Sequence, residues 1–237
     1  MLADIWDSIE VHRVDPPFEL VLTTGLVALA CVVIDAVWRP ARNVVTIVHE
    51  GGHAVAALLT GRRLTGIRLH SDTSGLTLSV GKPTGIGMIV TAAAGYLSPS
   101  FVGLIGVVLL AFGQVTVMLW AGLVVLVGML VMIRNVYGVL SLLVVGAVVL
   151  GVSLRADPDV QAAFGYGMTW FLLLGAVRPI TELQRHRRRH PGARSDADIL
   201  ARLTRLPAAV WVTIFALTTF AAALAGTYLL LTSGTSS

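Results

Sequence analysis

Two histidines and a glutamate stand together in the otherwise apolar residues 44–60. His49 and His53 are four residues apart, so on a helix both imidazoles project from one face and can hold one metal ion. Glu50 then lies beside that ion. Two neutral imidazoles suit Zn²⁺, and a neighbouring carboxylate can accept the proton of a water that the metal activates. The spacing predicts a metal-binding helix with His49 and His53 as zinc ligands and Glu50 as general base.

The elements that must position these residues are membrane helices. The chain is 56% hydrophobic and 13% charged, and apolar runs of roughly 20 residues recur, each long enough to cross a bilayer. We therefore expect an all-α polytopic membrane protein, with six to seven transmembrane segments in a single domain over residues 1–237. Residues 1–17 are expected to lie on the membrane surface. The expected segments are 18–38, the motif helix 44–60 after a tight turn at 39–43, a kinked 85–112, then 115–133, 136–154, 160–177 and 207–231.

The membrane setting strengthens the metal interpretation. In a chain of this composition the pattern His-Glu-x-x-His arises by chance roughly 0.0025 times. The alternative is a pair of core histidines with Glu50 as their hydrogen-bond partner. Ionisable groups in a membrane helix cost about 2.5 kcal/mol or more each and are usually retained for a function, which favours the metal site.

Residues 64–80 follow a different pattern, because apolar and polar residues alternate on either side of a polar turn at 71–75. This alternation predicts a β-hairpin. The hairpin is either an ordinary surface feature or an edge that receives an extended peptide by strand addition and brings it to the metal.

The basic residues carry the orientation signal. If the loops alternate sides, the N-terminal segment, the hairpin, Arg134 and a basic loop at 178–206 share one face and hold 14 of the 17 Lys and Arg residues. That face, with the active-site end, is predicted to be cytoplasmic. The positive charge is thus explained by basic loops that orient the chain in the lipid bilayer, and no nucleic-acid partner is expected.

A catalytic zinc site needs a third protein ligand. Asp35, Asp72, Asp157 and Asp159 each have a structural explanation as interface or turn residues. Asp196 and Asp198 remain, in the basic loop. A helix beginning at Ser195 would use these residues as its N-cap and first turn, and could still carry one carboxylate to the zinc. Asp196 is favoured, with Asp198 as the alternative.

One residue outside this group is a candidate for substrate positioning. Asn135, at a span boundary, could donate a hydrogen bond to a substrate carbonyl, although a loop asparagine needs no such role.

In these features the chain resembles the site-2 protease family of intramembrane zinc metallopeptidases. In this chain the zinc motif is followed by a predicted hairpin and by a span containing Gly95 and Pro99. The compact bacterial branch of the family also has two later segments. These are Ser-Asp-Ala, here residues 195–197, and Leu-Thr-x-Leu-Pro, here residues 203–207. The resemblance covers roughly residues 40–215. It implies Zn²⁺, cleavage of a membrane-embedded substrate helix, and the roles given above for His49, His53 and Glu50. The family's usual Leu-Asp-Gly motif, whose Asp completes the site, is absent, so Asp196 follows from elimination and from the Ser-Asp-Ala segment.

Three function classes follow. The first is a multi-pass metalloprotease of the cell membrane, with a membrane protein of one span as its expected substrate. The second is a metal-binding membrane transporter, which would need further polar residues, whereas the spans contain little beyond Asp35 and Gln114. The third is a catalytically inactive family scaffold, against which the intact motif argues. The oligomeric state is left open.

Overall fold

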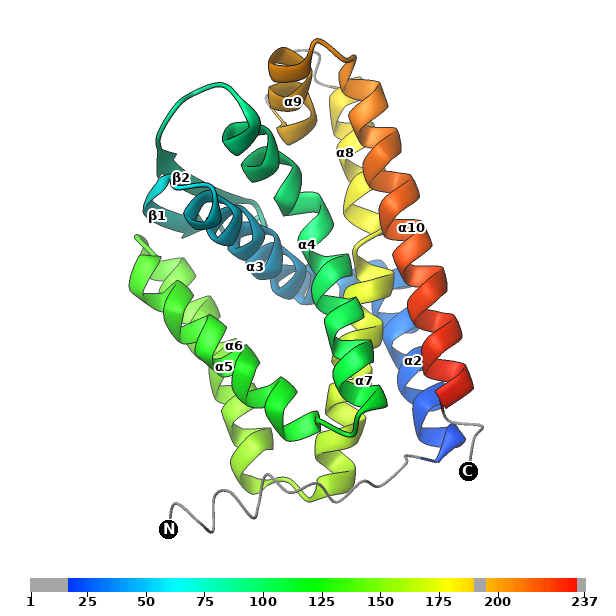
Figure 1. The fold of residues 1–237 in the computed structure, drawn as a ribbon. Helices are drawn as coiled ribbons and strands as arrows, with labels where there is room; N and C mark the ends of the chain where they lie inside the picture. The colour runs from blue at the N-terminus through cyan, green and yellow to red at the C-terminus, as the bar shows by residue number, and fades with distance from the viewer. Residues whose placement is uncertain (1–16, 190–194, 234–237) are drawn as a thin grey trace.

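The computed structural model describes residues 17–189 and 195–233, and within them the chain is helical apart from one β-hairpin (Figure 1). The expected interfacial segment, 1–17, lies outside the described residues except for Pro17. The all-α polytopic fold with a small hairpin is confirmed. The elements are α2 (Phe18–Val33), α3 (Asp35–Leu59), β1 (Arg63–Leu69), β2 (Gly75–Val80), α4 (Ile86–Ala111), α5 (Val115–Met132), α6 (Val136–Arg155), α7 (Pro158–Gly175), α8 (Arg178–Arg189), α9 (Asp196–Thr204) and α10 (Ala208–Ser233).

Five of the described helices are long and apolar enough to cross a membrane, and a bent helix pair brings the number to six. With this pair counted as one span, the number reaches the lower end of the expected six to seven. The bent pair consists of α2 and α3, whose axes differ by 101°. The two segments expected as separate crossings at 18–38 and 44–60 thus form one broken unit. The next expected span, with Gly95 and Pro99, is the single helix α4.

The break between α2 and α3 falls at Ile34, so the turn expected at 39–43 is wrong. Arg178, which is distant in sequence, contacts the chain on both sides of this break. The Arg178 guanidinium donates to the carbonyls of Val32 and Val33 at the end of α2 and pairs with Asp35 at the start of α3. A cation thus satisfies carbonyls that the helix end leaves free, and an acid begins the next helix. Pro40 lies inside α3, near enough to its start for the helix to continue.

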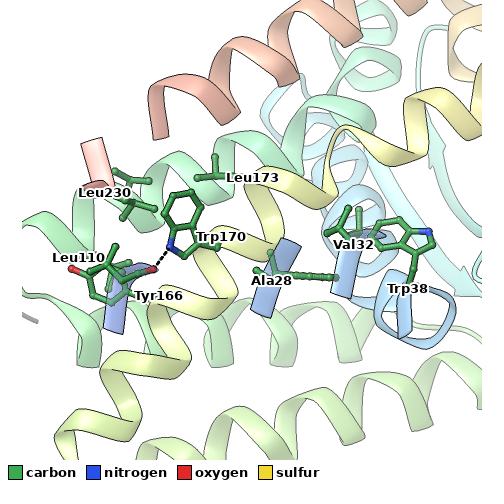
Figure 2. Close-up of a cluster of buried hydrophobic side chains, with 12 residues drawn as sticks. Ala28, Val32, Trp38, Leu110, Tyr166, Trp170, Leu173 and Leu230 are labelled. Atoms are coloured by element: carbon green, nitrogen blue, oxygen red, sulfur yellow. Dashed lines mark hydrogen bonds between the residues drawn. The ribbon is translucent and has the colours of Figure 1, made fainter. Parts of the chain in front are cut away.

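The start of α2 packs at the end of the bundle opposite the hairpin. Figure 2 shows the cluster of buried apolar side chains in which Leu110, from the end of α4, and Leu230, from the end of α10, lie together, and Val21 from the start of α2 belongs to the same cluster. Trp170 donates its indole N–H to the Val21 carbonyl over 3.1 Å. The chain therefore begins its first described helix away from the hairpin. The N-terminal segment expected on the face of the hairpin lies outside the described residues apart from Pro17.

The hairpin is confirmed as two antiparallel strands, with Leu69 opposite Gly75 at the turn. Ile67 and Leu69 on β1 are fully buried and pack against α3 and the α5–α6 pair. The outer edge of β1 is also occupied, because Ile67 forms a bridge with Ile133 and its carbonyl accepts from Arg134 N at 2.8 Å. Strand β2 is therefore the side of the hairpin that remains available among the described residues.

The basic segment at 178–206, expected as a loop, contains two helices: α9, which begins after Ser195 as the sequence suggested, and α8, which was not expected. Their apolar residues explain why: Ile180 and Leu183 of α8 and Ala197 and Leu200 of α9 are buried in one cluster that also contains Phe215 of α10. Burial of these side chains favours helices over an extended loop even though most of the surrounding residues are charged. In Figure 1 both helices lie at the hairpin end of the bundle.

Candidate active site

Helix α3 presents a polar stripe towards the hairpin and α8. Arg42, Thr46, His49, Glu50 and His53 follow one another at helical spacing along this stripe. Arg42 donates to the Thr73 hydroxyl and Thr46 donates to the Thr73 carbonyl, both over 2.8 Å, so the hairpin turn is held on the helix. The motif residues therefore lie beneath a fixed strand pair.

Three potential metal ligands converge from two helices. The Nε2 atoms of His49 and His53 are 3.1 Å apart. Oδ2 of Asp196, from the first residue of α9, lies 3.4 Å from His49 Nε2 and 3.3 Å from His53 Nε2. Asp196 thus lies next to both histidines. The sequence suggested this position for one of the two aspartates and favoured Asp196. The role of Asp196 as a metal ligand stays a prediction.

The tautomer of His53 is set by its second ring nitrogen. His53 Nδ1 lies 2.7 Å from the Thr91 carbonyl oxygen, which can only accept, so Nδ1 carries the hydrogen. In the neutral ring Nε2 then offers its lone pair to the shared point. Such an outer hydrogen bond orients a metal-binding imidazole and strengthens it as a ligand.

Helix α4 approaches the imidazoles through a glycine. A Cβ at Gly95 would lie 2.3 Å from His53 Nε2 and 2.6 Å from His49 Nε2, so any side chain there would displace the rings. Residue 95 therefore closes one side of the site with backbone alone.

This donor set fits Zn²⁺. Ligand atoms about 2.0–2.1 Å from a tetrahedral ion are separated from one another by roughly 3.3 Å, and the three separations observed are 3.1, 3.3 and 3.4 Å. With both Nε2 atoms deprotonated, two imidazole lone pairs and one carboxylate oxygen are available to surround a single cation. Two histidines with one carboxylate, and a fourth position for water, form a ligand set that catalytic zinc sites use.

Glu50 is buried beside these residues, and β2 holds its carboxylate. The Thr77 hydroxyl lies 2.6 Å from Glu50 Oε2 and 3.1 Å from the Glu50 backbone oxygen. A Cβ at Gly75 would lie 2.4 Å from Oε1, so β2 contacts the carboxylate directly through a glycine. The position of the proposed base is thus set by the strand.

Helix α9 is fixed by the other candidate aspartate. Asp198 accepts hydrogen bonds from the Ser195 backbone N–H and hydroxyl, and the Ser195 hydroxyl oxygen accepts from Asp198 N, which forms a capping box. Asp198 also pairs with Arg187 of α8 over 3.0 Å. Its carboxylate is therefore engaged in positioning α9, and the alternative ligand role for Asp198 has no support from this geometry.

The environment keeps Asp196 ionised. Burial alone would raise the pKa of this carboxyl group, but the charge of His53 and hydrogen bonds from His49 and His53 outweigh burial and lower the pKa below its ordinary value. An ionised oxygen is the form that binds a metal.

Asn135 serves the hairpin. Its side-chain oxygen accepts from Leu69 N at 3.2 Å and its amide donates to the Leu69 carbonyl at 2.6 Å. Both polar groups of the Asn135 side chain are hydrogen-bonded to the β1 backbone. The geometry therefore gives no support to the predicted contact of Asn135 with a substrate carbonyl. Asn135 instead completes the covering of the β1 edge.

A cavity of about 810 Å³ unites these features. Its walls come from α3, the hairpin, α4, α8 and α9, and His49, Glu50, His53 and Asp196 all line it. The volume is in the range of sites that take up sizeable ligands. Gly75 and Thr77 of β2 line the cavity as well, in contact with Glu50.

The fold and the site define a multi-pass membrane protein with a possible metal centre of two histidines and an aspartate. The family model for Peptidase M50B-like proteins matches residues 22–226, so the chain belongs to this family, and the resemblance to intramembrane peptidases is confirmed. No match was found among curated proteins or among solved structures. Family membership supports a protease of the membrane.

Sequence reasoning missed the residues that shape the site around the motif. Thr77 and Gly75 hold Glu50, Thr91 orients His53, and Gly95, noted only as part of the family resemblance, borders both imidazoles. A signal was present in the hairpin: Gly75, Thr77 and Ser79 alternate along β2, which places small or polar residues on one face.

Proposed function

We propose that this protein is a zinc-dependent intramembrane endopeptidase that hydrolyses a peptide bond of a membrane-embedded substrate. The observation that carries the proposal is the meeting of Asp196 Oδ2 with the Nε2 atoms of His49 and His53, in the cavity that also contains Glu50. His49, His53 and Asp196 would hold the ion. When bound, Zn²⁺ supplies Lewis-acid chemistry by acidifying water and polarising a carbonyl group.

Glu50 carries the proton transfers. Its carboxylate would accept the proton of the attacking water and later deliver it to the leaving amine. Thr77 keeps one carboxylate oxygen engaged, which fixes the direction of the other. Burial of Glu50, whose exposed fraction is 4%, limits competing contacts with bulk water.

The substrate would bind in an extended form along β2. A helical amide is shielded by its own hydrogen bonds, so the substrate must unwind before it can be cut. Pairing with a strand replaces those hydrogen bonds. Strand β2 suits this role because the outer edge of β1 is occupied by Ile133–Asn135, and because β2 borders the cavity beside Glu50.

The active-site end is proposed to face the cytoplasm. Of the 17 Lys and Arg residues, 13 belong to residues 62–82, Arg134 and residues 178–205. The described parts of these segments lie at the hairpin end of the bundle (Figure 1). An excess of basic residues marks the cytoplasmic side. The substrate, a membrane protein with one span, would therefore be cut near the cytoplasmic side of the bilayer.

Glu50→Gln tests the proposed function. The variant is expected to keep its zinc and to lose at least about 10²-fold in kcat, because an amide cannot act as a base. The assay uses purified protein in proteoliposomes with a library of single-span peptides, and mass spectrometry identifies the products. Full activity of Glu50→Gln contradicts the mechanism. Uptake of labelled zinc into the same proteoliposomes, with no peptide cleaved, supports the transporter instead.

A further inference from the structure

Tyr96 is held next to the histidines by two ring contacts. It follows Gly95 on α4, and its ring meets His49 edge-on, with the ring centroids 4.8 Å apart and the planes at 90°. The ring also stacks on Phe215 of α10, with the centroids 5.1 Å apart and the planes at 22°. Aromatic contacts of both kinds are favourable and fix a ring in place. Tyr96 is therefore a rigid neighbour of a proposed zinc ligand.

The Tyr96 hydroxyl is available as a donor. Tyr96 lines the same cavity as the proposed ligands and Glu50. Among the residues that the structure describes, its hydroxyl has no hydrogen-bond partner, and the two rings that clamp it offer no strong acceptor. A tyrosine hydroxyl in a largely enclosed position ordinarily finds a partner. A group that enters the cavity can supply that partner.

Other hydroxyl groups around the site are already engaged. Thr46 donates to the Thr73 carbonyl, Thr77 to Glu50, Thr91 to the Gly87 carbonyl and Ser195 to the Asp198 carboxylate. Tyr96 differs from these four, because its only described contacts are through the ring. Tyr96, in contact with His49, thus offers a hydroxyl donor that a substrate oxygen can claim without breaking a hydrogen bond described in the structure.

The geometry points to Tyr96 as a further catalytic residue, whose hydroxyl donates a hydrogen bond to the scissile carbonyl oxygen as negative charge builds on it. This inference rests on the proposed peptidase function. As the water oxygen bonds to the carbonyl carbon, the π electrons move to the carbonyl oxygen and Glu50 takes the proton of the water. When the C–N bond breaks, Glu50 returns that proton to the amine. Tyr96 keeps its own proton throughout.

The experiment compares Tyr96→Phe with the wild-type protein. Phenylalanine preserves the ring contacts with His49 and Phe215 and removes the hydroxyl alone. Loss of a donor to a developing oxyanion lowers kcat by about 10²-fold, and KM is expected to change by less than about 2-fold because the bond strengthens only in the transition state. The zinc content should equal that of the wild type. Tyr228→Phe, at an exposed position on α10, is the matched control and should change none of these quantities.

A binding measurement makes the test independent of turnover. A phosphinic peptide, whose tetrahedral anionic group imitates the charged carbonyl oxygen, should bind Tyr96→Phe about 10- to 100-fold more weakly than wild type. A cleaved product peptide should bind both proteins equally. Wild-type kcat and wild-type phosphinate affinity in Tyr96→Phe overturn the inference, as does loss of zinc, which would make Tyr96 a support for the metal site. A wild-type protein that cleaves no peptide overturns the proposed function itself, and the inference falls with it.

Discussion

The Thr77 hydroxyl lies 2.6 Å from Oε2 of Glu50, so a strand residue holds the proposed general base of a helix. The same hydroxyl lies 3.1 Å from the Glu50 backbone oxygen. The hairpin thus does more than border the cavity. Substrate is proposed to pair with β2, and the proposed base is the Glu50 carboxylate. The hairpin therefore links the substrate-binding strand to the catalytic carboxylate.

Removal of this hydroxyl should slow catalysis. Thr77→Val keeps the shape of the side chain, and loss of a hydrogen bond to a charged group should lower kcat by about 10-fold. Thr77→Ser retains the donor and should recover most of the activity. Thr65→Val on β1, which loses a hydrogen bond to the Leu78 carbonyl and none to Glu50, is the control. Steady-state cleavage of the same peptide by all three variants decides the matter, and equal rates for Thr77→Val and wild type would refute the coupling.

Gly95→Ala should damage the metal site without touching a ligand. The new methyl group would lie well inside contact distance of both imidazole Nε2 atoms, so the rings must move. Zinc affinity is expected to fall by at least about 10-fold. Gly122→Ala on α5, where a Cβ meets open space, should retain zinc. Competition with a chelator of known affinity measures both, and an unchanged affinity in Gly95→Ala would show that the imidazoles do not lie where described.

Asn135→Ala should release the edge of β1. The variant loses both hydrogen bonds to Leu69, so the Leu69 amide should exchange its hydrogen faster than in wild type, by about 10-fold for a loss of roughly 1.4 kcal/mol. Hydrogen exchange followed by mass spectrometry measures this change. Gln114→Ala, at the opposite end of α5, provides the comparison. Unaltered exchange over β1 in Asn135→Ala would mean that Ile133 and Arg134 hold the strand by themselves.

Arg178→Met should destabilise the corner between α2 and α3. It frees the carbonyls of Val32 and Val33 and leaves Asp35 and Glu182 without this guanidinium. Because the Arg178 side chain is 22% exposed, the expected loss is moderate, about 2 kcal/mol in the free energy of unfolding. Denaturation in mixed micelles measures it, with Arg188→Met, at an exposed position on the same helix, as the control. Equal stabilities would assign the break to local sequence.

The sequence predicted those parts of the site that depend on local spacing. His49, Glu50 and His53 lie on one helix, and alternation revealed the hairpin, so a few neighbouring residues contain the information. Asp196 could be proposed by elimination and from the Ser-Asp-Ala segment, and the helix start expected at Ser195 is present as α9. The distance between Asp196 and the histidines depends on packing of α9 against α4 and α10, and no local pattern contains it.

The failures have the same physical origin. The break at Ile34 is bridged by Arg178, more than a hundred residues further along the chain, while Pro40 gave a stronger but misleading local signal. The many basic residues of α8 favoured the prediction of a loop, although Ile180 and Leu183 in the same segment are buried. Asn135 could be assigned to the hairpin only once its contacts with Leu69 were known.

The zinc content of the purified protein tests the central claim most directly. Elemental analysis should find about one zinc per chain in the wild type, and little in His49→Ala or Asp196→Ala, because each removes one of three protein ligands. Asp198→Asn, which keeps an acceptor for the α9 cap, should retain zinc. A wild type that binds no zinc after gentle extraction and zinc add-back, or an Asp196→Ala variant with its full zinc content, would contradict the site described here.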